Sequence, residues 1–264
     1  MFSSDPLQLL LRTLEIHEPL EEGDRAAIRA LPTAVRMIEP QGYLVREGDH
    51  PDMCVVLLSG FAIRQKLTGD GARQIVSLHI AGEPLDFQNL YLEESDHSVQ
   101  ALTRAEVAFI PRTAVQELVA TRPAVAGAIL HFTLVEASIF REWVLNVGRR
   151  NAPARLAHFL CELAVRLEAQ GLSARTRFDM PLTQEQLADI SGLTPVHVNR
   201  TLMALQSEGL IARRGRRVEI PDWAALRDYG DFNERYLHLA PRHATGHAPR
   251  QRTIAGRDLH QSQT

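Results

Sequence analysis

Residues 182–211 read LTQEQLADISGLTPVHVNRTLMALQSEGLI, and this stretch decides the fold. It predicts two short helices joined by a tight turn. Thr183 is a favourable N-cap, and the glutamine three residues later completes a capping box. Gly192 suits a turn in a backbone conformation that other residues resist. The second helix begins with Thr194 as its N-cap and Pro195 at its first position, where a missing N–H costs nothing.

The second helix has two distinct faces when its residues are placed at 100° intervals. One face, expected to pack on the first helix, consists of Val198, Thr201, Leu202 and Leu205. The other consists of Val196, Asn199, Arg200 and Met203, with Pro195 and His197 beside them. Arginine pairs bidentately with guanine, asparagine pairs with adenine, and an apolar group meets the thymine methyl. The stretch therefore predicts a helix-turn-helix that reads the major groove, with an ordinary helical hairpin as the alternative.

Two clusters of arginines lie close to this motif in the sequence, although the net charge of the whole chain is −3. One cluster is Arg149, Arg150 and Arg155, and the other is Arg213, Arg214, Arg216 and Arg217. Residues 211–220 alternate as a small β-hairpin that turns at Gly215, which is typical of the wing of a winged helix. The wing arginines are therefore predicted to contact DNA phosphates, rather than to be solvated turn charges only.

The composition is that of a soluble globular protein with one or two domains: 264 residues, 45% hydrophobic and 23% charged. No apolar run approaches the length of a membrane span, and the N-terminus does not resemble a signal peptide. We therefore expect a cytoplasmic protein with no membrane partner. The two cysteines, Cys54 and Cys161, exclude a disulfide framework and a four-thiolate cluster.

Residues 1–31 are predicted to be helical, and residues 34–111 are predicted to form short strands separated by glycine turns. The predicted strands are residues 35–38, 43–45, 54–58, 61–63, 74–80, 99–102 and 106–110. Many short strands at this spacing favour an antiparallel barrel or sandwich. The segment Thr68-Gly-Asp-Gly71 has the composition of a hairpin turn.

A short helix at 113–120 is followed by a long one from Pro123 to about Arg149. Two apolar sides run along the long helix, which suggests one partner inside the chain and a second outside it. A parallel copy of the same helix is the simplest second partner, and burial inside one chain is the alternative. We assign the dimer interface to Ile129, Phe132, Val135, Ile139 and Trp143. The second apolar side consists of Leu130, Leu134 and Ala137.

Pro153 marks a hinge at residues 151–153, because it disfavours helix at the preceding residue and can begin a new one. An amphipathic helix then runs to about Ala169, and a terminal helix is expected over residues 222–237. The expected parts are a β-roll sensor-like domain with N-terminal helices (1–122), a long dimerisation helix (123–150), a winged helix-turn-helix domain (151–238) and a disordered tail (239–264). The fold class is α+β, with an N-terminal antiparallel β-roll of jelly-roll type.

Barrel, long helix, hinge and winged helix-turn-helix, in this order, resemble the Crp/Fnr family of bacterial transcription regulators. The resemblance covers roughly residues 15–228 and is strongest at 183–211 and in Thr194-Pro-Val-His-Val-Asn-Arg-Thr-Leu202. It implies a homodimer joined through the long helix, whose two recognition helices read major grooves about 34 Å apart on a pseudo-palindromic site. It also implies RNA polymerase as a further partner. Arg200 matches the arginine that the family uses on guanine, whereas Val196 stands where many members carry glutamate.

The effector region departs from the cyclic-nucleotide-binding members of that family. Those members carry Gly-Glu-Leu and then an Arg-Ser or Arg-Thr pair whose arginine binds the cyclic phosphate. Here the matching residues are Gly82 and Glu83, and then Asp96, His97 and Ser98. A phosphate beside Asp96 without an arginine would be poorly compensated, so cyclic AMP is disfavoured. Gly82, Glu83, His97 and Ser98 are the candidate pocket for an unknown small-molecule effector, and no cofactor is expected.

Other signals and an enzymatic function find less support in the sequence. Haem would need an axial ligand from His79, His97 or Cys54, and a lone barrel histidine is usually structural. Buried cysteines are normally inert, which disfavours a redox switch. A cupin-like metalloenzyme would need clustered ligands, whereas the histidines of the barrel occur singly, and no metal site is predicted. The predicted function is thus a DNA-binding transcription regulator and not an enzyme, with a cyclic-nucleotide- or haem-responsive regulator as the alternative.

Overall fold

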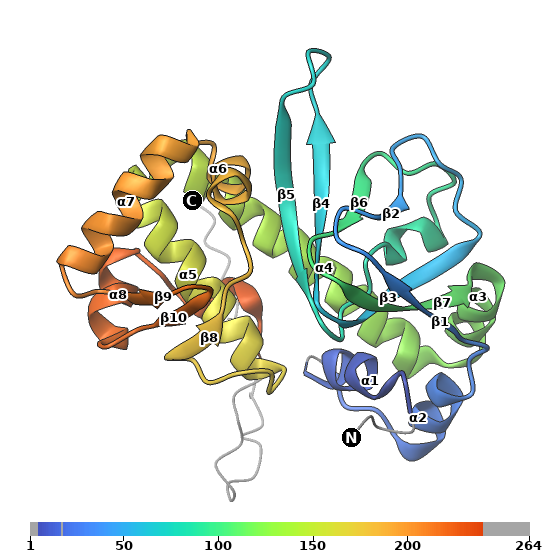
Figure 1. Ribbon diagram of the computed structural model, residues 1–264. Helices are drawn as coiled ribbons and strands as arrows, with labels where there is room; N and C mark the ends of the chain where they lie inside the picture. The colour runs from blue at the N-terminus through green and yellow to red at the C-terminus, as the bar shows by residue number, and fades with distance from the viewer. Residues whose placement is uncertain (1–4, 17, 240–264) are drawn as a thin grey trace, which may run out of the picture.

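The computed structural model describes residues 5–16 and 18–239, which form two lobes connected by one long helix (Figure 1). The N-terminal lobe contains two packed antiparallel sheets with strand orders β1-β7-β3 and β2-β6-β4-β5. Its strands are β1 (Ala34–Ile38), β2 (Tyr43–Val45), β3 (Met53–Ser59), β4 (Phe61–Leu67), β5 (Arg73–Ile80), β6 (Ser98–Ala101) and β7 (Ala105–Pro111). The predicted α+β fold with an N-terminal antiparallel roll is confirmed.

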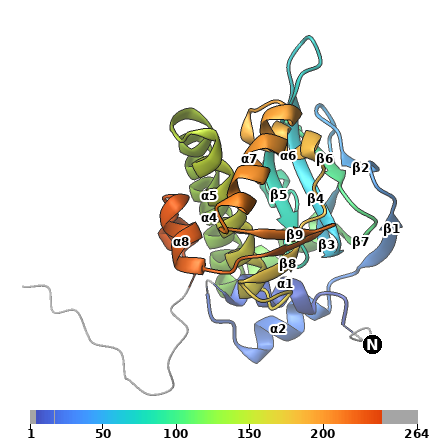
Figure 2. The same ribbon diagram turned by 60° about the vertical axis from the view of Figure 1, so that its left-hand side comes forward.

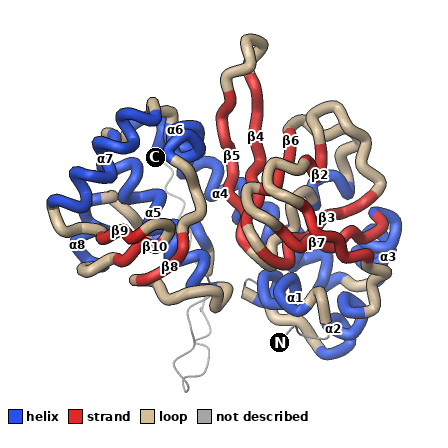
Figure 3. Tube along the Cα trace, in the orientation of Figure 1, coloured by secondary structure: helices blue, strands red, loops and turns tan. Residues whose placement is uncertain are grey.

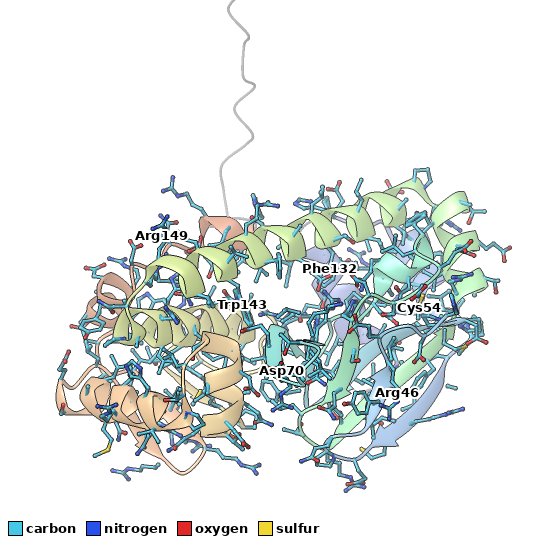
Figure 4. The ribbon with its side chains drawn as sticks, turned by 90° about the horizontal axis from the view of Figure 1, so that it is seen from above. Arg46, Cys54, Asp70, Phe132, Trp143 and Arg149 are labelled. Carbon is cyan, nitrogen blue, oxygen red and sulfur yellow. The ribbon has the colours of Figure 1, made fainter. Side chains whose placement is uncertain are left out.

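Helices cover one end of the roll and then lead out of it. They are α1 (Gln8–Glu15), α2 (Glu22–Arg29), the 3-10 helix η1 (Phe87–Leu90), α3 (Arg112–Thr121) and α4 (Pro123–Arg149). The first of these packs three leucines, together with Leu7 just before it, into a core shared with β3 and the first turns of α4. Seen from above in Figure 4, α4 crosses the whole molecule, and Phe132 and Trp143 lie on its side facing the two lobes.

The C-terminal lobe is a helical unit with a small three-stranded sheet, order β8-β10-β9 (Figure 3). Its elements are α5 (Ala152–Ala169), β8 (Arg177–Asp179), α6 (Gln184–Ser191), α7 (Pro195–Ser207), β9 (Ala212–Arg214), β10 (Arg217–Glu219), α8 (Trp223–Tyr229) and η2 (Glu234–Leu237). In the turned view of Figure 2, α4, α5 and α8 lie on one side of the molecule and the sheets of the roll on the other. This arrangement makes α5 the central helix of the lobe, and most of its side chains are buried.

The break between α4 and α5 is only two residues long. Arg150 and Asn151 are extended, and the Asn151 side chain accepts a hydrogen bond from the Ala154 backbone N–H at 3.0 Å. This cap begins α5 with Pro153 in its first turn, as predicted for the hinge. The orientation of the C-terminal lobe relative to α4 therefore depends on very few backbone torsions.

Three expectations need correction. The helix expected over residues 222–237 is interrupted at Gly230, where an added Cβ would come within 2.7 Å of the His158 backbone nitrogen. Strand β8 was not predicted, because its three residues are too few to show the alternation of a strand. The third correction concerns α4, which is long and apolar enough to span a membrane by length and composition alone. The tail expected to be disordered lies, from residue 240 on, outside the described residues.

Candidate nucleic-acid interface

Both helices of the helix-turn-helix begin with the side-chain N-caps expected from the sequence. The hydroxyl oxygen of Thr183 accepts a hydrogen bond from the Gln186 N–H at 3.1 Å, and the Gln186 side chain accepts one from the Thr183 N–H at 2.8 Å. The hydroxyl of Thr194 accepts from the His197 N–H at 3.2 Å, so α7 begins at Pro195. Gly192 has a φ of 62°, the left-handed conformation that lets the chain turn between the two helices.

Helix α7 presents the predicted reading face to solvent. Its inner face is buried, and it consists of Val198, Thr201, Leu202 and Leu205. On the outer face, Val196 is 69% exposed, and Asn199 and Arg200 are also exposed. Within the described residues the Arg200 guanidinium has no hydrogen-bond or ion-pair partner, so its five donors are available to a ligand. Asn199 differs, because its side-chain oxygen accepts a hydrogen bond from Gln184 of α6 at 2.9 Å.

The wing is the hairpin of β9 and β10, which turns at Gly215 with a φ of 62°. Its arginines are not equivalent. Arg214 and Arg216 are exposed, and no partner for either side chain occurs in the described part of the chain. Arg213 is half-buried, which lowers its pKa, and Arg217 pairs with Asp179 of β8 at 3.3 Å. Arg214 and Arg216 are therefore the wing residues with free charge.

The turn of the helix-turn-helix rests on the end of the long helix. A Cβ on Gly192 would lie 3.2 Å from the Val147 side chain of α4. Arg155 of α5 donates hydrogen bonds to the Ser191 carbonyl at 2.5 Å and to the Arg150 carbonyl at 2.9 Å. Of this basic cluster, Arg155 thus links the turn of the motif to residue 150 at the hinge.

The roll also contacts the helix-turn-helix directly, through strand β5. The Arg73 guanidinium pairs with the Asp189 carboxylate of α6 at 2.7 Å, and Gln74 donates to the Asp189 carbonyl at 2.6 Å. Ile75, Leu78 and Ile80 of the same strand belong to one core cluster with α5 and α6. The sensor-like lobe and the DNA-reading motif are therefore packed against each other.

A buried ion network lies under this contact, centred on Arg166 of α5. Its guanidinium donates to both Glu83 oxygens at 2.9 Å, to Glu162 at 3.2 Å and to the Leu78 carbonyl at 2.8 Å. Burial is the largest single influence and raises the pKa of Glu83, but the charges and hydrogen bonds of Arg166 and His79 together outweigh it and lower that pKa to about 2. Glu162 also accepts hydrogen bonds from Trp143 of α4 at 3.0 Å and from Tyr236 at 2.8 Å. One network thus joins the roll, α4, α5 and the C-terminal segment.

Three of the four residues predicted for the effector pocket serve the structure itself. The backbone of Gly82 lies close to α1 and has a φ of 96°. Its carbonyl accepts a hydrogen bond from the Thr13 hydroxyl at 2.7 Å. Glu83 is held by Arg166, and the Ser98 hydroxyl accepts from the Glu47 N–H at 3.0 Å. Of the predicted set, Glu83 and His97 line a cavity of about 470 Å³ between the roll, α4 and α5.

Three cations line that cavity, Arg166 of α5 and two on strand β4, and none of them was predicted from the sequence. Arg64 and Lys66 are two residues apart on β4 and therefore share a face of the strand. The sequence predicts this strand only as far as Ile63, which is why the pair was missed. Following the alternation to Leu67 would have placed both cations on one face. The cavity thus has permanent cations on β4, although residues 96–98 supply none.

The apolar side of α4 that was assigned to the dimer interface is buried inside the chain instead. Ile129, Phe132, Val135 and Trp143 are buried inside the chain, and Ile139 packs against the same core that contains Trp143. They cannot contact a second copy, because the roll and α5 already cover them. The exposed apolar side chains of α4 are instead Leu130, Leu134, Phe140, Val144 and Leu145.

Neither cysteine has the surroundings of a reactive thiol. Cys54 and Cys161 are both buried and unpaired, and burial raises the pKa of each thiol to about 12. A thiol with this pKa is almost wholly protonated at neutral pH and is a poor nucleophile. Among the described residues, no group of three or more histidine, cysteine, aspartate or glutamate side chains is placed to hold a metal ion.

Comparison with known proteins gives the same two parts as the structure. Residues 35–122 match the cyclic nucleotide-binding domain family, and residues 154–229 match the Crp-like helix-turn-helix domain family. The chain is 32% identical over 188 residues to the transcriptional activator protein FnrL of Cereibacter sphaeroides, covering 69% of this chain and 75% of that protein. It is 31% identical over 199 residues to the nitrogen fixation regulation protein FixK of Rhizobium meliloti, covering 74% of this chain and 87% of that protein.

A solved structure shares the fold. The structure of FixK2 from Bradyrhizobium japonicum superposes with a TM-score of 0.69 at 22% identity, over 75% of this chain and 98% of that one. The two matched domains thus follow each other in the order seen in the structure, and the fold is shared with a solved structure. The chain belongs to the Crp/Fnr family and is a transcription regulator with a helix-turn-helix DNA-binding domain.

Proposed function

We propose that the protein is a homodimer whose two α7 helices read successive major grooves of a pseudo-palindromic DNA site. The observation that carries this proposal is the unpartnered Arg200 guanidinium on the exposed, capped end of α7. The N-terminal end of this helix carries Thr194, Pro195 and His197, and free backbone N–H groups there can donate hydrogen bonds to a DNA phosphate. Val196 and Asn199 complete the base-reading face, and Arg214 and Arg216 are placed to contact phosphates beside it. Thr183, at the start of α6, is a further candidate for backbone contact.

The exposed apolar side of α4 supports the dimer. Leu130, Leu134, Ala137 and Val144 are separated by intervals of four, three and seven residues, which is the repeat of a two-stranded coiled coil. A parallel copy would cover this side along most of α4 and would place the two reading helices symmetrically. The same side explains why α4 is apolar enough to resemble a membrane span. We therefore propose that a second copy of the chain, rather than lipid, covers this side of α4. As a transcription regulator, the protein is further inferred to be cytoplasmic, to have RNA polymerase as a partner and not to be an enzyme.

Selection of duplexes from a randomised pool tests the function. The wild-type protein should select a two-fold-related site, and Arg200→Ala should lose discrimination at one base pair per half-site. A bidentate contact of this kind contributes about 1–3 kcal/mol of discrimination. Arg104→Ala is the matched control, since Arg104 is an exposed arginine of the roll and its removal changes the net charge equally. The proposal fails if Arg200→Ala selects the same site as the wild-type protein with unchanged preference.

A further inference from the structure

One hydrogen bond joins the two helices of the helix-turn-helix on their exposed side. It runs from the side-chain amide nitrogen of Gln184, the first residue of α6, to the side-chain oxygen of Asn199 in α7 at 2.9 Å. Both residues are exposed, so the core does not impose this contact. The first helix of such a motif crosses the DNA backbone, whereas the recognition helix enters the major groove. The bond therefore connects a residue beside the DNA backbone with one on the proposed base-reading face.

The caps of the two helices do not require this bond. The capping box at the start of α6 consists of Thr183 and Gln186, and the cap of α7 is Thr194. Neither Gln184 nor Asn199 takes part in a cap. The effect of the bond is therefore on the Asn199 amide itself.

The bond fixes which way round the Asn199 amide is turned. A free asparagine amide rotates between two orientations that exchange its oxygen and its nitrogen. With its oxygen held by Gln184, Asn199 keeps one lone pair on that oxygen and both of its N–H groups, for which the described residues supply no partner. An acceptor beside a donor matches the N6 amino group and N7 of adenine. The contact thus orders, before DNA binds, an amide that would otherwise be ordered only in the complex.

The Gln184 amide nitrogen carries a second hydrogen, and no acceptor for it occurs in the described part of the chain. A DNA phosphate oxygen beside the start of α6 would be such an acceptor. Glutamine can therefore donate to Asn199 and to a phosphate at once. Glutamate in its place could donate to neither.

We propose that Gln184 is a specificity-determining residue that positions Asn199 to select adenine in each half-site, while its second amide hydrogen binds a DNA phosphate. The base at this position is thus chosen by both helices of the motif together. This inference rests on the proposed DNA-reading function of α7.

Affinities of the full chain for duplexes in which each base pair is replaced in turn test the proposal. The parent duplex is the site that the wild-type protein selects from the randomised pool, and Kd is measured by fluorescence anisotropy at fixed salt. Asn199→Ala identifies the base pair that Asn199 reads, and Arg200→Ala identifies the one that Arg200 reads. We expect adenine at the first of these. Its replacement by 7-deazaadenine, which lacks N7, should weaken binding of the wild-type protein and leave Asn199→Ala unchanged.

Three substitutions of Gln184 separate hydrogen-bond donation from side-chain size and charge. Gln184→Ala and Gln184→Glu, which remove the donor, should each lower the preference for adenine by about threefold to tenfold, the effect of one neutral hydrogen bond. Gln184→Arg retains donors for Asn199 and for phosphate and should keep most of the preference. The preference at the Arg200 base pair should stay unchanged in all three variants. Gln206→Glu, a control at an exposed glutamine near the end of α7, should change neither preference.

Several results would overturn the proposal. They are an unchanged preference for adenine in Gln184→Ala and Gln184→Glu, an equal loss at both base pairs, a loss in Gln184→Arg as large as in Gln184→Ala, and a wild-type site with another base, or with no base pair that depends on Asn199. Each of these leaves the proposed function standing, because that function is tested by the two-fold site and by Arg200→Ala. If the wild-type protein selects no two-fold site, the proposed function and this inference both fail.

Discussion

Replacing Arg166 with methionine tests the buried network that joins the two lobes. The side chain is 9% exposed and lies between Glu83 and Glu162, so the variant leaves two carboxylates facing each other without a cation. Removing one partner of a buried ion pair costs about 3–5 kcal/mol of folding free energy. The pKa of Glu83 lies at about 2 instead of 4.5 as the net result of burial, Arg166 and His79, a difference that corresponds to about 3 kcal/mol in favour of the charged carboxylate in the folded protein.

The pH dependence of this loss follows from the sign of the pKa change. Because the pKa of Glu83 is lowered in the folded protein, its stabilisation is present above pH 4.5 and is lost as the pH falls towards 2. Arg166→Met should therefore lose about 3–5 kcal/mol at pH 7 and less at pH 4, where the orphaned carboxylate can bind a proton.

Urea unfolding at fixed protomer concentration, followed by the fluorescence of Trp143 and Trp223, measures the effect. The double variant Glu83→Gln, Arg166→Met should recover most of the loss, because Glu162 keeps its bonds from Trp143 and Tyr236. Arg104→Met, at an exposed pair, should show no measurable change. A loss below about 1 kcal/mol at pH 7, or no recovery in the double variant, would refute the reasoning.

Three further changes test other parts of the structure. Leu134→Asp should convert the proposed dimer to monomers in analytical ultracentrifugation, whereas Leu67→Asp, at a similarly exposed leucine, should leave it dimeric; a Leu134→Asp variant that stays dimeric would contradict the proposed interface. Burial raises the pKa of Asp86 to about 7, so stability to urea should fall as pH rises from 4 to 7, and Asp86→Asn should flatten that fall. Gly192→Ala should lower stability by about 1–2 kcal/mol, because a φ of 62° is strained for alanine; unchanged stability would argue against the turn geometry.

The helix-turn-helix could be predicted in detail because its signals are local. Thr183, Thr194 and Gly192 act within one turn of the chain, and the reading face of α7 follows from helical period alone. The two sides of α4 could not be assigned in the same way. Both are apolar at helical spacing, and only the position of the roll decides that Phe132 is covered and Leu134 is not.

Features that depend on contacts distant in sequence were missed or misplaced. Gly230 ends α8 because the backbone of His158 lies against it, and the two are 72 residues apart. Glu83 has the spacing of an effector ligand in the sequence, yet Arg166, 83 residues away, occupies it. The cations of the cavity were missed for a simpler reason, because the strand carrying Arg64 was predicted four residues too short. The periodicity of the sequence thus predicts where helices and strands lie better than it predicts which distant residues contact them.

Because Gly192 packs against Val147 near the C-terminal end of α4, a tilt of this helix displaces the helix-turn-helix. The helix has 27 residues and is about 40 Å long, and the turn of the helix-turn-helix lies near its C-terminal end, remote from the end that follows α3. A tilt of α4 by only about 5° about its N-terminal end moves its C-terminal end by about 3.5 Å, which is close to the 3.4 Å rise of one base-pair step. In the proposed dimer, small changes in the packing of the roll against α4 would therefore change the spacing between the two DNA half-sites that the α7 helices can reach, by roughly one base pair for each protomer.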